Sequence, residues 1–303
     1  MNVPIPDFGQ LDLFLHSGAV VLANNVADAL LARDAVRAAE CLDRLLAHAP
    51  DHQACKALET LCHVLREWPL PSGSPAEIDK AIRRLETDAR PAALAAMGDR
   101  AAQFMRSLWR DLAQAASAHV YDLTFPQSYS AALYLRCGDA ESAATAAQAI
   151  ADCEHNADAL HWLAVARYRI DGLDACRIPL MRLALLEPER LPRALAEIDD
   201  PLLERDWNAF HAACHWLDPD DQTVGAWFPA WHLVEHPGIR IDCGGPASLP
   251  ATRAAQTFVA IARLLDLEKH GYSNTLISAR GRLRDLDAHI FDFYIARRHV
   301  SRR

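Results

Sequence analysis

Apolar residues recur along most of the sequence at intervals of three or four residues, which places them on one face of an α-helix. In the segment 35–50, Ala38, Leu42 and Leu45 fall on one such stripe, and Pro50 ends it because proline cannot continue the helical hydrogen bonds. Alternating apolar and polar residues, which would predict strands, are nearly absent. Glycine accounts for only 12 of the 303 residues, a bias that favours helix. The sequence therefore predicts an all-α protein.

Turn-forming residues divide the predicted helices. The densest group is PLPSGSP at 69–75, and its end is also a helix start. Ser74 is the expected N-cap, Pro75 the first helical residue, and Glu77 completes a capping box. The predicted helical segments are 19–31, 35–50, 52–68, 75–87, 91–121 with a break at Gly98, two hairpins over 128–156 and 156–189, 191–215, a short helix within 226–238, 251–270 and 274–297.

The two hairpins repeat one another. Each consists of a helix, a corner that contains glycine, and a second helix. Tyr134 and Tyr168 are 34 residues apart, and so are Gly138 and Gly172. A fixed period of this length is the sequence signature of a helical repeat.

This period, with small residues where the helices cross and a proline after the second helix, resembles the tetratricopeptide repeat. The segments that match are 19–52 and 126–190, whereas 53–125 does not repeat. The glycine corner of the 157–190 unit is one residue out of register, and Pro179 lies inside its second helix. A non-repetitive helical bundle stays open as the alternative. The matching residues are Leu163, Ala164, Cys176, Leu183 and Pro188, with Ala38, Leu45 and Pro50 in the N-terminal unit.

The resemblance implies a solenoid of helical hairpins, similar to tetratricopeptide repeats, followed by a C-terminal helical bundle. It also implies recognition of a protein or peptide on the concave face of the solenoid, although it specifies no particular ligand. We expect four segments: N-terminal helical hairpins at 1–68, a linker and long helices at 69–125, repeats at 126–190 and a C-terminal helical region at 191–303.

Composition narrows the range of partners and the environment. The net charge of −9 and the pI near 5.8 argue against general affinity for nucleic acid, which needs a basic surface. No apolar run approaches the roughly 20 residues that span a bilayer, and no signal peptide opens the sequence. Eight cysteines are scattered without a C-x-x-C pair, which favours free thiols in a reducing compartment. We therefore expect a cytoplasmic protein that binds neither nucleic acid nor membrane.

The stretch from His232 to His236 has the order H-x-x-E-H, which matches the zinc motif of the inverted-motif metalloproteases. Two histidines four residues apart can bind zinc from one helix face, with Glu235 as a base. The distant glutamate ligand of that family has no counterpart, however, and Pro237 ends the helix directly after His236. Helical geometry favours an ordinary amphipathic helix with this polar face outward. The metal alternative would use His211, His215, His232, Glu235 and His236.

Four of the seven tryptophans lie within 25 residues, from Trp207 to Trp231. They indicate a buried core between the repeats and the C-terminal region, or an aromatic groove for a partner. The candidate partner-binding residues are Trp207, Trp216, Trp227 and Trp231, together with Tyr134 and Tyr168 of the repeats.

Charged clusters give two further alternatives. Asp199, Asp200 and Glu204 have the D-D-x-x-x-E spacing of the magnesium motif in class I terpene synthases, but Pro201 favours a simple helix start. The segment 280–303 holds seven arginines and three aspartates, which indicates a solvated helix face or a docking patch for an acidic partner.

The function favoured by the sequence is an adaptor or scaffold that binds another protein or a peptide. The sequence assigns no catalytic residue and no cofactor. Two alternatives remain: an all-α metal-dependent enzyme that uses the acidic and histidine residues of 199–236, and a structural subunit of an oligomer. A homo-oligomer is compatible with each of these functions.

Overall fold

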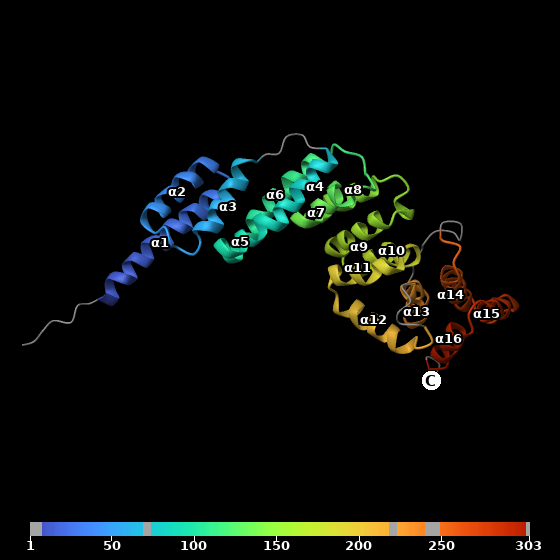
Figure 1. Cartoon of the computed structure of the whole chain (residues 1–303). Helices are drawn as coiled ribbons and strands as arrows, with labels where there is room; N and C mark the ends of the chain where they lie inside the picture. The colour runs from blue at the N-terminus through green and yellow to red at the C-terminus, as the bar shows by residue number, and fades with distance from the viewer. Residues whose placement is uncertain (1–7, 69–73, 218–222, 240–248, 301–303) are drawn as a thin grey trace, which may run out of the picture. The chain divides into compact units, whose positions relative to one another are not determined.

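The computed structural model describes residues 8–68, 74–217, 223–239 and 249–300 (Figure 1). Over these ranges the chain forms α-helices with short π and 3-10 segments and contains no strand, which confirms the all-α prediction. The chain divides into two compact units, Met1–Asp139 and Ala140–Arg303. The division falls inside the segment 126–190 that we expected to be continuous repeats.

The first unit is built from helices that pack on their neighbours in sequence. α1 packs on α2, α2 on α3, α3 on α5, and α6 on α7. One cluster of buried apolar side chains, which includes Leu30, Leu58 and Phe104, joins them. The helices are α1 Phe8–Leu31, α2 Ala35–His48, α3 Cys55–Arg66, α4 Pro75–Arg84, α5 Arg90–Met97, α6 Ala101–Ala116 and α7 Ser130–Cys137.

Of the two predictions about α4, the one about its start is confirmed and the one about its end is wrong. The capping box is confirmed: Ser74 N donates to Glu77 Oε2 at 2.9 Å, and Glu77 N donates to Ser74 Oγ at 3.4 Å. The predicted helix end near residue 87 is wrong, because a π-helical turn at Leu85–Ala89 connects α4 to α5 without a break. Pro91 lacks an N–H, and the wider turn before it accommodates the missing hydrogen bond. Residues 69–73 of the predicted linker lie outside the described residues.

The second unit also packs in sequence order, with α8 on α9 and α9 on α10. Further along, α13 contacts α10, α12, α14 and α16, and α14 contacts α15. The central place of α13 in these contacts determines the burial of its side chains. The helices are α8 Ala140–Gln148, α9 Ala157–Asp171, α10 Leu173–Leu186, α11 Leu191–Ile198, α12 Pro201–Ala213, α13 Phe228–Glu235, α14 Arg253–Lys269, α15 Asn274–Leu286 and α16 Ala288–Val300.

Two helices that we expected to be single are divided at aspartates. The segment 191–215 breaks at Asp199, which adopts a left-handed conformation with φ 54°. Asp200 then caps α12, as the helix-start interpretation requires. Its Oδ1 accepts hydrogen bonds from Leu202 N at 2.8 Å and from Leu203 N at 3.1 Å. The segment 274–297 breaks at Asp287, whose carboxylate accepts from Ile290 N at 2.8 Å. Short acidic side chains end and restart helices because they compete for backbone N–H groups.

A polar network connects the last three helices around Glu268 of α14. Its carboxylate accepts hydrogen bonds from Tyr294 and, at 3.0 Å, from Arg280, and it lies 3.4 Å from Arg298 Nε. Arg297 pairs with Glu235 of α13 at 2.5 Å. Three arginines of the predicted docking patch are therefore committed to pairs inside this unit, while residues 301–303 lie outside the described residues.

Most cysteine thiols of the described residues are buried. The seven described cysteines are free, and Cys153 alone among them is partly exposed. Burial raises the pKa of Cys62 and Cys176 to about 11 and that of Cys214 to about 12. In the ranges that the structure describes, no helix combines the length and the apolar character needed to cross a membrane.

Candidate functional site

The tryptophans of the second unit belong mainly to its interior. Trp231 is 2% exposed and stacks on Phe293 of α16 at a centroid distance of 6.3 Å. Phe210 of α12 lies edge-on to Trp231 at 5.8 Å and stacks with Trp207 at 5.5 Å. These rings join α12, α13 and α16. Trp231 therefore offers no surface to a partner, as the core interpretation expects.

The other predicted partner-binding residues are partly buried, and each has contacts within its own unit. Trp216 stacks on His289 at 5.1 Å, and Trp227 lies beneath the guanidinium of Arg253 at 5.9 Å. Tyr168 donates a hydrogen bond to Asp200 Oδ2 at 2.9 Å. Tyr134 belongs to the first unit, where it packs against the apolar core. Their role in partner binding stays a prediction.

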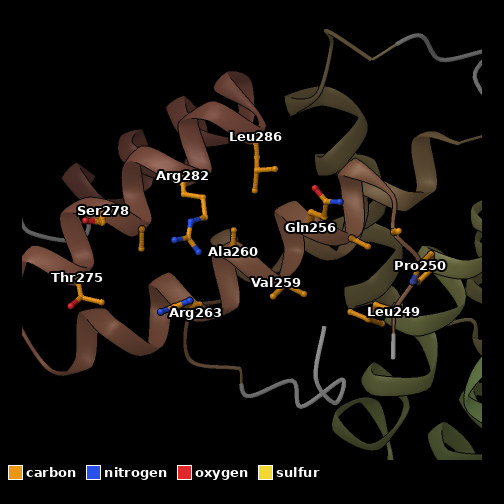
Figure 2. A pocket seen from close by; sticks show the side chains of 13 residues that line it. Leu249, Pro250, Gln256, Val259, Ala260, Arg263, Thr275, Ser278, Arg282 and Leu286 are labelled. Atoms are coloured by element: carbon orange, nitrogen blue, oxygen red, sulfur yellow. The ribbon is translucent and has the colours of Figure 1, made fainter. Parts of the chain in front are cut away.

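A pocket of about 520 Å³ lies between α14 and α15 of the second unit (Figure 2). Leu249, Pro250 and Leu286 contribute apolar surface toward one end, and Val259 and Ala260 of α14 line the floor.

The opposite end of this pocket is polar and positively charged. Arg282 from α15 and Arg263 from α14 both extend their guanidinium groups into the space between the two helices, beside Thr275 and Ser278 (Figure 2). Both arginines are exposed, and neither forms a salt bridge within the described part of the chain. This pocket has no signature in the sequence, because Leu249, Arg263 and Arg282 belong to three separate segments.

The H-x-x-E-H stretch is not the outward face that we expected. His232 is 0% exposed, because α13 is contacted by helices on several sides. Burial, followed by the nearby charges of His236 and Arg177, lowers the pKa of His232 to about 3. The imidazole is therefore neutral at neutral pH. Neither of its ring nitrogens has a hydrogen-bond partner in the part of the chain that the structure describes.

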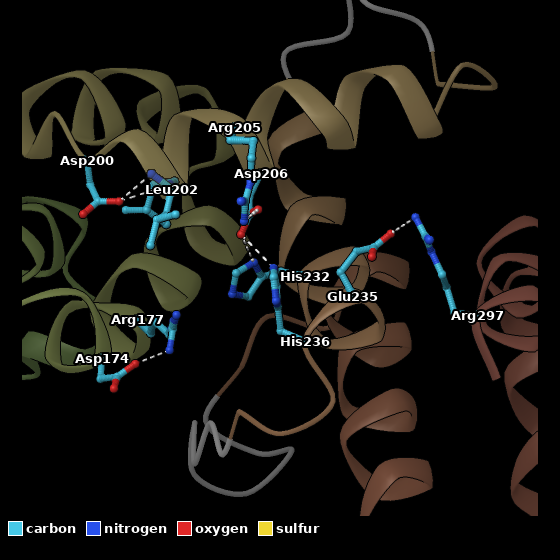
Figure 3. A network of polar contacts seen from close by, with 11 residues as sticks. Asp174, Arg177, Asp200, Leu202, Arg205, Asp206, His232, Glu235, His236 and Arg297 are labelled. Carbon is cyan, nitrogen blue, oxygen red and sulfur yellow. Dashed lines mark hydrogen bonds and ion pairs between the residues drawn. The ribbon is translucent and has the colours of Figure 1, made fainter. Parts of the chain in front are cut away.

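His232 and His236 converge on a carboxylate from another helix, that of Asp206 in α12 (Figure 3). Asp206 Oδ2 lies 2.7 Å from His236 Nε2 and 3.6 Å from His232 Nδ1. One potential ligand atom from each residue lies within 4.8 Å of the others. Asp206 is 8% exposed, His232 is fully buried and the side chain of His236 is 31% exposed, so the cluster is largely buried and offers donor atoms that suit a metal ion.

This cluster corrects the set of ligands that the sequence suggested. His211 is exposed and packs edge-on against Trp207 at 4.4 Å, rather than lying on the buried stripe of its helix. His215 lies beside Trp216 at 5.8 Å, and Glu235 pairs with Arg297. None of these three joins the cluster.

Asp206 was missed, although the sequence carries a signal for it. Leu203, Asp206 and Phe210 are spaced three and four residues apart and share the buried face of α12. A carboxylate on an apolar stripe is uncommon because burying an unpaired charge is unfavourable. The pattern therefore marks Asp206 as an unusual buried position, although nothing in the sequence connects it to His232 and His236.

Comparison of the chain with models of protein families, with curated proteins and with solved structures gave no match. The geometry of the chain itself is thus the basis for any functional assignment.

Proposed function

We propose that this protein is an adaptor that binds a peptide segment of another protein, built on helical hairpins similar to tetratricopeptide repeats and a C-terminal helical bundle. The pocket between α14 and α15 carries this proposal, because it combines an apolar end with two arginines. The segment it would bind contains an apolar residue next to one or more acidic residues.

Local geometry supports the repeat architecture. Gly138 and Gly172, which are 34 residues apart, both follow the first helix of a predicted hairpin and have positive φ values of 82° and 80°. Glycine is favoured there because residues with a Cβ seldom adopt this conformation. In the second unit, α9 and α10 pack on one another as the two helices of one such hairpin. Neither feature identifies a partner, so the pocket is the more specific argument.

Charge complementarity favours an acidic occupant. Arg263 and Arg282 extend into the same space, whereas the whole chain has a net charge of −9. A guanidinium group binds a carboxylate with two parallel hydrogen bonds, which gives such contacts both strength and directional specificity. Leu249 and Leu286 would meanwhile cover an apolar side chain and contribute by removing its surface from water.

Selection from a random peptide library on the purified full chain tests this proposal. We expect enriched peptides to contain Asp or Glu within a few residues of a large apolar side chain. The Arg263→Glu/Arg282→Glu variant should lose this enrichment. Arg284→Glu is the matched control, since Arg284 is exposed on α15 and does not line the pocket.

Two results would contradict the proposal. One is enrichment of the same peptides on the wild type and on the doubly reversed variant. The other is an equal loss of enrichment with Arg284→Glu, which would indicate a general effect of charge rather than recognition in the pocket. Circular dichroism of all three proteins checks that each variant remains folded.

A further inference from the structure

His232 is a buried side chain whose polar atoms are not satisfied by the described residues. The ring is completely buried, yet neither Nδ1 nor Nε2 has a hydrogen-bond partner among the described residues. Buried polar atoms are nearly always satisfied, and an unsatisfied one in a polar cluster is commonly explained by a bound water or ion. Asp206 Oδ2 lies 3.6 Å from Nδ1, which is too far for a hydrogen bond.

We propose that Asp206, His232 and His236 bind a zinc ion, with Asp206 Oδ2, His232 Nδ1 and His236 Nε2 as the ligand atoms. This inference goes beyond peptide binding and does not depend on it. Imidazole nitrogens and a carboxylate oxygen are an established ligand set for zinc. Three protein ligands leave the fourth position of a tetrahedral ion for water or another small ligand.

The distances from Asp206 Oδ2 to the two histidine nitrogens can be compared with those that zinc requires. Zinc binds nitrogen and oxygen at about 2.0–2.2 Å, so two ligand atoms of a tetrahedral site lie roughly 3.3–3.6 Å apart. The distance of 3.6 Å between His232 Nδ1 and Asp206 Oδ2 already fits. The 2.7 Å contact from Asp206 to His236 must lengthen by roughly 0.7 Å, since a hydrogen bond is replaced by two metal bonds.

His236 has the freedom to make that adjustment. It lies just after the end of α13, with φ −119° and ψ 64°, and its side chain is 31% exposed. In the hydrogen-bonded state Nε2 carries a proton that it donates to Asp206, because an ionised carboxylate only accepts. Zinc needs the lone pair of Nε2, so the neutral ring must carry its proton on Nδ1 instead. Partial exposure lets Nδ1–H donate to water.

Two arginines near the cluster would repel a cation, but the effect of each charge is reduced. Arg205 Nη2 lies 3.4 Å from Asp206 Oδ1, and Arg177 acts electrostatically on His232. The charge of Arg177 is offset by its ion pair with Asp174, and the side chain of Arg205 is 66% exposed, so solvent screens it. Glu235 is paired with Arg297 and does not compete as a ligand in this arrangement. The single carboxylate of Asp206 therefore faces the ion together with two neutral nitrogens.

Metal titration of the full chain tests this inference. After dialysis against a chelator, the protein is titrated with ZnCl₂ by calorimetry, and with CoCl₂ while the visible absorption of tetrahedral cobalt is recorded. We expect one equivalent of metal to bind and the melting temperature to rise with zinc concentration. Asp206→Asn and His236→Gln should each weaken binding by at least about 100-fold. The double variant His211→Gln/His215→Gln, which removes two exposed histidines outside the cluster, should bind as the wild type does.

His236→Gln is the decisive variant because the ring of His236 is partly exposed, so we expect the variant to remain folded. Absence of zinc binding to the wild type would overturn the inference. Unchanged binding by His236→Gln would overturn it as well, and would assign the metal to surface histidines. The peptide selection that tests Arg263 and Arg282 is carried out in the presence of a chelator. The proposals of peptide binding and of zinc binding are therefore tested separately.

Discussion

His161 and Glu197 form a polar pair at the edge of the core of the second unit, between α9 and α11. His161 is 7% exposed, and its Nε2 lies 2.8 Å from Glu197 Oε2. The hydrogen bond from His161 is the largest influence on the carboxyl group, and it lowers the pKa of Glu197 against the opposing effect of burial. The pair therefore links the protonation of one side chain to the stability of the fold.

This pair predicts a specific loss of stability in acid. The folded chain keeps Glu197 ionised to a lower pH than the unfolded chain, in which its pKa is near 4.5. The stabilisation is therefore present above about pH 4.5 and is lost as the pH falls through the lowered pKa. Glu197→Gln should be less stable than the wild type at neutral pH and should show a weaker dependence of stability on pH in this range.

Urea unfolding of both proteins between about pH 7 and pH 3 provides the measurement. Glu189→Gln is the matched control, since Glu189 is exposed and lies only eight residues earlier in the sequence. Parallel curves for the wild type and Glu197→Gln would show that the pair contributes no pH-dependent stability.

At the level of single residues, the cluster of Asp206, His232 and His236 was only partly predictable from the sequence. His232 and His236 could be identified from their spacing of four residues on one helix. Their burial could not, since it depends on α10, α14 and α16, which come from segments far away in the sequence. Asp206 is on a different helix from both histidines, and no local pattern connects it to them.

Among the helical elements, the short 3-10 segment Val224–Trp227 shows how closely the chain approaches itself before α13. A Cβ on Gly225 would lie 2.6 Å from the backbone oxygen of Pro188, a separation that real Cβ atoms essentially never show. The contact is with backbone, so it cannot be relieved by rotating a side chain. Gly225 therefore allows this 3-10 segment to lie directly against the turn Pro188–Arg190 that follows α10.

Two glycine substitutions should have opposite effects on stability. Gly225→Ala forces the backbone apart and should destabilise the chain by about 2 kcal/mol or more. Gly281→Ala is the control: it lies within α15, where a Cβ would meet no atom, and should stabilise by roughly 0.5–1 kcal/mol because alanine favours helix. Chemical unfolding measures both. Equal stability of Gly225→Ala and the wild type would show that the approach to Pro188 is not a constraint.

Helices were predictable at this scale, and the connections between them were less so. Periodicity identified α2, α9 and α10, and the capping box placed the start of α4 because its residue types act locally. The π turn between α4 and α5 was missed because Pro91 usually indicates a helix start after a break. The breaks at Asp199 and Asp287 were also missed, since an aspartate on the polar face of a helix gives the same pattern.

For the whole molecule, the two units have separate apolar cores, and both candidate sites belong to the second one. The all-α class followed from composition and periodicity, which require no knowledge of long-range contacts. The 34-residue period favoured repeats similar to tetratricopeptide repeats, and that architecture stays a prediction. The same holds for a homo-oligomer, which a mass measurement in solution addresses.

The central claim is that the pocket between α14 and α15 binds acidic peptide segments. A charge-swap binding measurement tests it most directly. Dissociation constants are determined by fluorescence anisotropy for a selected acidic peptide and for a peptide with lysine at its acidic positions. Each is titrated with the wild type and with Arg263→Glu/Arg282→Glu. We predict that the double reversal weakens binding of the acidic peptide by at least about tenfold and that the lysine peptide restores most of the affinity to the reversed protein. Equal affinity of both proteins for the acidic peptide, or no recovery with the lysine peptide, would contradict recognition of acidic segments by this pocket.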